Sequence, residues 1–331
     1  MSISIPKLDT PGVENPGPET LTGVRLAVLV VYHFDDFLQG LVAVHLDHLR
    51  RYTPPGTVIF GAAIRLARAQ HNWLSAQPDV HLPELGTLPH GYREEHNGAL
   101  DRLAKIAFHE GATHVATMHQ DSFPVRADWL ARLTTDLDAI TPFAVAERRA
   151  YNCCMVWDES WQAHGPTMLP GDALRDQAMP KLMAERPDLD FSDGGIGHLL
   201  LAHSLGLGWR ALRHTAPDIL DGRILHLTGS SRIAHAERIP RRDTNLATKL
   251  RSLARPMLPH IPKRLRKSLG RAVGVHSVQT PEVSIGRDGS AQDKRDQVSR
   301  LVADPDAYVA QALCEPLLPG ARWANQRASQ T

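Results

Sequence analysis

The chain has 331 residues, of which 42% are hydrophobic and 22% charged, a composition that is ordinary for globular protein. Its formal net charge of +1 gives no reason to expect a nucleic-acid partner or a strongly acidic one. Three cysteines, two of them adjacent at Cys153 and Cys154, do not make a disulfide framework, which indicates a reducing compartment.

The beginning of the chain indicates a flexible leader. Residues 1–22 hold four prolines and few large apolar groups, and they lack the basic start and apolar block of a signal peptide. The most apolar run, Val24 to Tyr32, is far too short to span a bilayer. We therefore expect a cytoplasmic protein that meets a membrane only at its surface.

Apolar runs then alternate with helical patterns. In chain order, the expected strands are 25–31, 57–60, 80–82 and 113–118, and the expected helices are 36–52, 62–75, 97–110 and 128–139. Further strands are expected at 141–146, 153–157, 209–212 and 224–227, and a helix within 194–206. This alternation predicts βαβ units and an α/β fold with a mostly parallel sheet flanked by helices. His45 and His48 are expected on an exposed helix face, without a functional role.

The composition changes near residue 235. Segment 236–271 contains eleven Lys or Arg residues and two acidic ones, a net of +9. We expect a leader (1–22), an α/β domain (23–235) and a basic, mainly helical extension (236–331). The basic segment indicates either a solvated helix pair or contact with an anionic membrane surface. Because it has no aromatic residue to stack on bases, we expect no nucleic-acid partner.

A carboxylate lies where the fourth expected strand ends. Strand 113–118 runs directly into His119-Gln120-Asp121. Open α/β sheets bind ligands at the carboxyl ends of their strands. A carboxylate there suits a divalent cation that is shared with substrate phosphates. Such a metal offsets the negative charge that develops on a departing diphosphate.

The stretch from residue 91 to 133 resembles the family 2 glycosyltransferases. It carries, in order, a turn with Asn and Gly, a helix of small residues, a strand, an altered D-x-D motif, a proline and a Trp-Leu pair. These are His96-Asn97-Gly98, Leu100 to Phe108, Thr113 to Met118, His119-Gln120-Asp121, Pro124 and Trp129-Leu130. The resemblance covers roughly residues 24–232. It implies a GT-A fold with a Rossmann-like nucleotide-binding half, and transfer of a sugar from a nucleoside diphosphate sugar to a hydroxyl acceptor.

The resemblance also implies roles for single residues. Asp121 matches the aspartate that holds Mn²⁺ or Mg²⁺, and His226, in a late strand followed by Leu-Thr-Gly-Ser-Ser, matches a histidine that completes the metal site. Asp193, which precedes two glycines and a helix, matches the general base for the acceptor hydroxyl, which implies inversion at the anomeric carbon. Specificity for the acceptor is expected in residues 147–192, with Arg148, Arg149, Asn152 and Trp157 as candidates.

Two features depart from the family pattern. His119 stands where the first aspartate of D-x-D is usual, and the second strand ends in Gly61-Ala-Ala63 instead of an Asp-rich turn. Tyr32 and Asp35 could instead supply a stacking ring and a carboxylate. Together with Asn97 and His119, they form the expected nucleotide contacts.

Plainer interpretations stand beside these roles. Asp121 suits a turn, Asp35 and Asp193 suit helix starts, and His226 suits a strand end. Three other functions also fit the sequence. The protein could be a GT-A-shaped binding or scaffold protein without catalysis, or a peripheral membrane protein that acts through its basic tail. It could also be a nucleotidyltransferase, although Tyr32 to Asp36 is not the Gly-rich basic loop expected there.

Overall fold

The computed structural model describes residues 23–146, 153–187, 189, 194–227 and 291–315. The chain divides into two compact units, residues 1–227 together with 301–331, and residues 228–300. The first unit carries both sheets and the predicted metal ligands. Within the described ranges, no helix has the length and apolar character needed to cross a bilayer. The expected leader 1–22 and the basic segment 236–271 lie outside the described residues.

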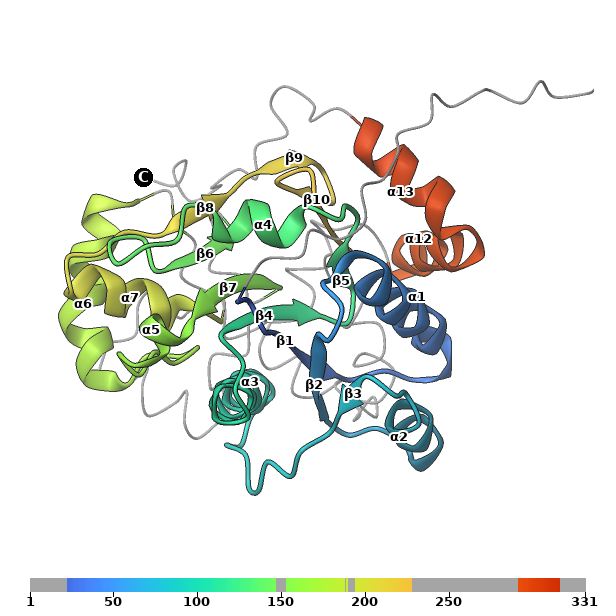
Figure 1. Cartoon of the computed structure of the whole chain (residues 1–331), viewed down its shortest axis with the longest axis horizontal. Coiled ribbons are helices and arrows are strands. Elements are labelled where there is room, and N and C mark those ends of the chain that lie inside the picture. Colours follow the sequence, from blue (N-terminus) through green and yellow to red (C-terminus); the bar gives the residue numbers. More distant parts are fainter. Residues whose placement is uncertain (1–22, 147–152, 188, 190–193, 228–290, 316–331) are drawn as a thin grey trace, which may run out of the picture. The chain divides into compact units, whose positions relative to one another are not determined.

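The main sheet has seven strands in the order β3-β2-β1-β4-β7-β6-β8 (Figure 1). Strand β1 (Leu26–Tyr32) runs parallel to β2 (Val58–Ala63) and to the central strand β4 (His114–His119), and β2 runs parallel to β3 (Val80–His81). This parallel half matches the strands expected from the sequence. It brings the carboxyl ends of β1, β2 and β4 to one edge, which is where open α/β sheets bind ligands.

The other half of the sheet is mixed. Strand β7 (Cys154–Asp158) runs antiparallel to both β4 and β6 (Phe143–Ala146), and β6 runs parallel to β8 (Arg210–Leu212). The predicted α/β fold, with a mostly parallel sheet flanked by helices, is thereby confirmed for the described part of the chain.

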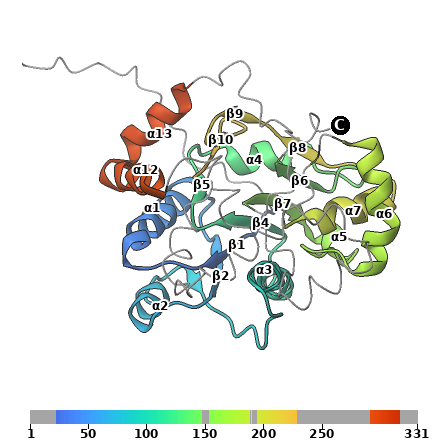
Figure 2. The same ribbon diagram turned by 180° about the vertical axis from the view of Figure 1, so that it is seen from behind.

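Helices cover both faces of the main sheet. One face packs against α3 (Tyr92–His109), α5 (Glu159–Gln162), α6 (Asp172–Glu185) and α7 (Ile196–Ser204). Alternate β1 residues Ala27, Leu29 and Val31 point into that core, as the two-residue period of a strand requires. Figures 1 and 2 show α1 (Asp36–Tyr52) and α4 (Trp129–Thr134) on the side opposite α3, and α2 (Arg68–Ser75) beside β3.

A second, antiparallel sheet starts where β4 ends. Its strands are β5 (Ser122–Pro124), β11 (Ile224–His226), β10 (Ile219–Leu220) and β9 (His214–Ala216), in that order. The hairpin between β10 and β11 turns through Asp221 and Gly222, both with positive φ (50° and 66°). Asp-Gly is a strong hairpin signal because both residues tolerate this left-handed conformation. This sheet carries residues from two distant parts of the sequence to one place.

Two helices follow near the C-terminus, α12 (Ala291–Ala303) and α13 (Pro305–Cys314). The end of α12 reaches α1, where a Cβ placed on Gly40 would lie 2.9 Å from Cγ1 of Val302. Arg51 on α1 pairs with Asp306 on α13 at 2.8 Å. Residues Val302 and Asp306 therefore contact α1 within the first unit, a contact that the sequence did not indicate.

Candidate metal centre

The three predicted ligand residues His119, Asp121 and His226 converge. Nδ1 of His119 and Nε2 of His226 each lie 3.8 Å from Oδ1 of Asp121. Each residue offers one ligand atom, and these atoms lie within 4.8 Å of one another. Separations of 3.8 Å are too long for hydrogen bonds. They suit ligand atoms that share one ion through bonds of about 2.0–2.2 Å.

The three residues differ in how far they are buried. Asp121 is 1% exposed and His226 is 4% exposed, whereas the His119 side chain is 22% exposed. A buried carboxylate carries a desolvation cost that a bound cation offsets. His119 is therefore the candidate ligand that is most open to solvent.

The second sheet creates this convergence. Asp121 joins β4 to β5, and β5 pairs with β11 so that Ser122 lies opposite His226. The next residue, Leu227, donates its backbone N–H to the carbonyl of Asp121 at 2.9 Å. The register of β11 against β5 therefore sets the distance between His226 and Asp121.

Ser122 holds the tight turn that presents Asp121. Its Oγ accepts a hydrogen bond from the N–H of His119 at 2.8 Å and donates one to the carbonyl of Cys153 at 2.7 Å. These bonds tie the turn to the residue that precedes β7. They fix the backbone on both sides of Asp121.

Two buried histidines on α1 bind the other edge of β5. Nδ1 of His45 donates to the carbonyl of Ser122 at 2.9 Å, and Nδ1 of His48 donates to that of Pro124 at 3.1 Å. A carbonyl can only accept, so Nδ1 carries the proton in both rings. The expectation that His45 and His48 are exposed is wrong, because they replace a missing strand on this edge. Burial lowers the pKa of His45 to about 4, which keeps it neutral.

Tyr32 extends this arrangement into the main sheet. Its hydroxyl lies 3.5 Å from Nε2 of His45, and its ring packs edge-on against Phe34 and His45. The side chain is fully buried, and burial raises the pKa of its hydroxyl. Tyr32 therefore supports α1, the helix that holds β5, and its complete burial leaves no ring face on which a nucleotide could stack.

Gln120, between the two motif ligands, bridges two loops. Its Oε1 accepts from the N–H of His33 and its Nε2 donates to the carbonyl of His33, both at 2.8 Å. Nδ1 of His33 donates in turn to the carbonyl of Ile64, just after β2, at 3.0 Å. The carboxyl ends of β1, β2 and β4 are thus cross-linked beside the candidate metal ligands.

His96 adds a third imidazole next to the site. Its ring centroid lies 5.4 Å from that of His119, nearly perpendicular to it. Burial first, and then the neighbouring His119 and His33, lower the pKa of His96 to about 3, so the ring is neutral. Its Nε2 is buried and has no hydrogen-bond partner among the described residues.

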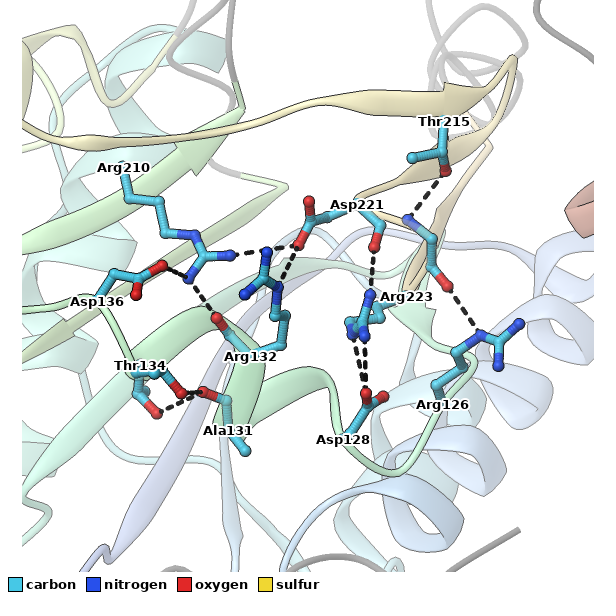
Figure 3. Close-up of polar contacts among 12 residues, drawn as sticks. Arg126, Asp128, Ala131, Arg132, Thr134, Asp136, Arg210, Thr215, Asp221 and Arg223 are labelled. Atoms are coloured by element: carbon cyan, nitrogen blue, oxygen red, sulfur yellow. Dashed lines mark hydrogen bonds and ion pairs between the residues drawn. The ribbon is translucent and has the colours of Figure 1, made fainter. Parts of the chain in front are cut away.

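Ion pairs fasten the hairpin that carries β11 (Figure 3). Arg223 pairs with Asp128 at 2.8 Å, and Arg126 donates to the carbonyl of Gly222 at 3.1 Å. Asp221 lies 3.9 Å from Arg132 and 3.5 Å from Arg210. Arg210 also pairs with Asp136 at 2.8 Å. These contacts tie the hairpin to the ends of α4, and so support the register that places His226.

The remaining predicted contacts lie elsewhere or outside the described residues. Oδ1 of Asp35 caps α1 by accepting from the N–H of Leu38 at 3.0 Å. Asn97 is buried inside α3, where its side chain donates to the carbonyl of Arg93 at 2.8 Å, so His96-Asn97-Gly98 is helix and not a turn. Trp157 lies in the core of the main sheet, which removes it as an acceptor contact. Asp193, Arg148, Arg149 and Asn152 lie outside the described residues.

Sequence reasoning missed the residues that position the ligands. The sequence patterns predicted no role in positioning the candidate ligands for five residues, namely His33, His45, His96, Gln120 and Ser122. The Asp221-Gly222 pair was a visible signal for the hairpin that presents His226. No comparable signal marked Gln120, because its role depends on a loop 87 positions away.

No protein-family model matches the sequence. No curated protein matches it either. Solved structures share the arrangement weakly. A nucleotide-diphospho-sugar transferase from Desulfovibrio desulfuricans has 13% identity and a TM-score of 0.30, over 41% of this chain and 64% of that one. Mouse xyloside xylosyltransferase 1 has 10% identity and a TM-score of 0.36, over 58% and 84%.

A third solved structure contains a metal and a nucleotide. It is glucosyl-3-phosphoglycerate synthase from Mycobacterium tuberculosis with Mn²⁺, uridine diphosphate and phosphoglyceric acid. It has 12% identity and a TM-score of 0.28, over 52% of this chain and 53% of that one. TM-scores of this size assign no activity. The evidence for the function of this chain therefore comes from its own residues.

Proposed function

We propose that this protein is a metal-assisted glycosyltransferase, which moves a sugar from a nucleoside diphosphate sugar to a hydroxyl acceptor. The observation that carries the proposal is the convergence of His119, Asp121 and His226 at the carboxyl end of β4. Two imidazoles and a carboxylate form a sensible donor set for a divalent cation. The cation would stabilise the negative charge on the departing diphosphate.

Each residue has a definite task in this proposal. Asp121 supplies the negative charge that retains the ion, and its burial strengthens their attraction. His226 closes the buried side, whereas His119 lies on the side that is more open to solvent. The diphosphate would therefore approach past His119. Gln120 and His33 hold the surrounding loops in place before a substrate arrives, which avoids an ordering cost on binding.

The proposed general base remains Asp193, on the resemblance to family 2 enzymes. Two observations fix the backbone just after it. The N–H groups of Gly195 and Gly197 both donate to the carbonyl of Met168 at 3.0 Å. An aspartate there that took the acceptor's proton would give inversion at the anomeric carbon. Of the expected nucleotide contacts, His119 is the one proposed here, because Asp35 caps α1 and Asn97 is buried inside α3.

The test is turnover of donor substrates. Purified protein with Mn²⁺ is incubated with UDP-, GDP- and dTDP-sugars and a panel of hydroxyl acceptors, and release of the nucleoside diphosphate is measured for the wild type and Asp121→Asn. The proposal predicts release from one donor class, strongly reduced in the variant. Binding of a donor without consumption would instead make this a non-catalytic binding protein. Consumption of nucleoside triphosphates with pyrophosphate release would identify a nucleotidyltransferase.

A further inference from the structure

The donor atoms of the metal centre are unusually rich in nitrogen for a site that binds diphosphate. The cluster holds two imidazoles, from His119 and His226, and one carboxylate, from Asp121. Among the described residues, no second carboxylate belongs to this cluster. The ring of a further histidine, His96, lies beside His119.

The chemistry of these donors discriminates between cations. Mg²⁺ is hard, prefers oxygen ligands and keeps several of its waters, so sites for it are built from carboxylates and phosphates. Imidazole is a borderline ligand that suits Fe²⁺, Ni²⁺, Cu²⁺ and Zn²⁺, and two histidines with one carboxylate form a common site for Fe²⁺. Replacing one carboxylate by imidazole removes one negative charge and one hard oxygen. The affinity of the site for Mg²⁺ should fall most on that replacement.

Burial adds to this discrimination. Asp121 and His226 are almost completely buried. An ion in that position exchanges water for protein ligands on its inner side. Mg²⁺ gives up water reluctantly, whereas a first-row transition ion gains strong bonds to imidazole nitrogen.

We propose that this centre selects a first-row transition ion and discriminates against Mg²⁺, and that His119 is the residue that sets this selectivity. The inference rests on the proposed function for the purpose of the metal, but metal binding tests it without a nucleotide. Affinity should increase from Mn²⁺ to Co²⁺, and Mg²⁺ should bind most weakly of the three because it takes oxygen ligands and dehydrates reluctantly.

The experiment measures binding of MgCl₂, MnCl₂ and CoCl₂ to metal-free full-length protein by calorimetry. The visible absorption of Co²⁺ reports directly on its ligands. In His119→Asp the ratio of Mg²⁺ affinity to Co²⁺ affinity should rise at least about tenfold, because a hard oxygen replaces nitrogen. Asp121→Asn should abolish binding of all three ions. The matched control is His109→Asp, an exposed position about 20 Å farther along α3 from His96, where all affinities should stay unchanged.

Two results would overturn the inference. If Mg²⁺ binds the wild type as tightly as Mn²⁺, the centre does not discriminate against Mg²⁺. If His119→Asp leaves the affinity ratio unchanged in a folded protein, His119 does not set the selectivity. Neither result would affect the donor-turnover test, so the proposed transferase activity would stand. If none of the three ions binds the folded wild type, the metal centre itself is refuted, and the metal-assisted form of the proposed function with it.

Discussion

The side-chain amide of Gln120 pairs with the backbone of His33 through two hydrogen bonds of 2.8 Å, one in each direction. Strands β1 and β4 are neighbours in the sheet up to Val31 and His119. Beyond that point their backbones no longer pair. The side-chain amide of Gln120 instead bonds to the backbone N–H and carbonyl of His33. The residue between the two motif ligands thus holds the loop after β1 in place.

Gln120→Glu should destabilise the fold and loosen the metal centre. A carboxylate cannot donate, so one oxygen would face the carbonyl of His33 in a buried place. We expect a loss of about 1–3 kcal/mol in the free energy of unfolding, measured with urea, and weaker Mn²⁺ binding. The matched control, Gln177→Glu at an exposed position on α6, should change neither. Equal stability of the two variants would show that the bridge contributes nothing.

The Arg223–Asp128 pair should act on metal affinity through the position of β11. Their side chains are 24% and 41% exposed, so the pair itself contributes no more than about 1 kcal/mol to stability. Arg223→Asp and Asp128→Arg each place like charges together at the base of the hairpin. Each should weaken Co²⁺ binding several-fold, and the double exchange should recover part of the loss. A double variant as weak as the worse single variant would mean that the ion pair does not position His226.

Acid should destabilise the protein through its buried histidines. Nδ1 of His198 accepts a hydrogen bond from Trp161 at 3.0 Å, and burial lowers the pKa of His198 to about 3. In the unfolded chain the His198 imidazole takes up a proton below about pH 6.5, but in the folded chain it stays neutral until the pH is near 3. The stabilisation is therefore complete above pH 6.5 and is lost as the pH falls toward 3.

At pH 4.5 this single imidazole should lower the free energy of unfolding by about 2–3 kcal/mol relative to its value above pH 6.5. Chemical unfolding of the wild type and His198→Asn at pH 7.5 and 4.5 tests the assignment. Asparagine keeps an acceptor for Trp161 but does not titrate, so the variant should lose less stability between the two pH values. The same loss in both proteins would contradict a neutral His198 in the fold.

Gly197 is needed where α7 begins. A Cβ at this position would lie 2.0 Å from the carbonyl oxygen of Thr167 and 3.1 Å from the backbone of Leu169. Backbone cannot rotate out of the way, so Gly197→Ala should cost about 1–3 kcal/mol in thermal or urea unfolding. At Gly208 the nearest atom to an added Cβ is 3.7 Å away, and Gly208→Ala should be close to neutral. Similar effects at the two positions would argue against the close packing of α7 on residues 167–170.

Local patterns were enough to predict the parallel half of the sheet and α1. The apolar spacing over 36–52 predicted the bounds that the structure shows, because Asp35 caps the start and Pro54 lies just beyond the end. The candidate metal ligands were chosen by a different route. His119 and Asp121 follow a buried strand, but His226 is more than a hundred residues away and was identified only by resemblance.

What could not be predicted depends on contacts between distant segments. His45 and His48 looked like surface residues because histidine is polar. In the described part of the chain, however, they donate to carbonyls of β5 that pair with no strand. Helix α6 escaped notice because Pro180 lies inside it and its apolar residues show little periodicity. The short strands β5, β9 and β10 have too few residues for an alternating pattern to show.

The most direct test of the central claim is the binding of nucleoside diphosphate sugars to the full chain with and without Mn²⁺, followed by thermal stability. At a donor concentration of 100 times the dissociation constant, binding should add about 2.7 kcal/mol to the stability of the fold. The proposed centre predicts a shift with one donor class that requires Mn²⁺ and disappears in Asp121→Asn and His226→Ala. A shift of equal size without metal, or one that survives in both variants, would contradict a metal at His119, Asp121 and His226 that holds the diphosphate.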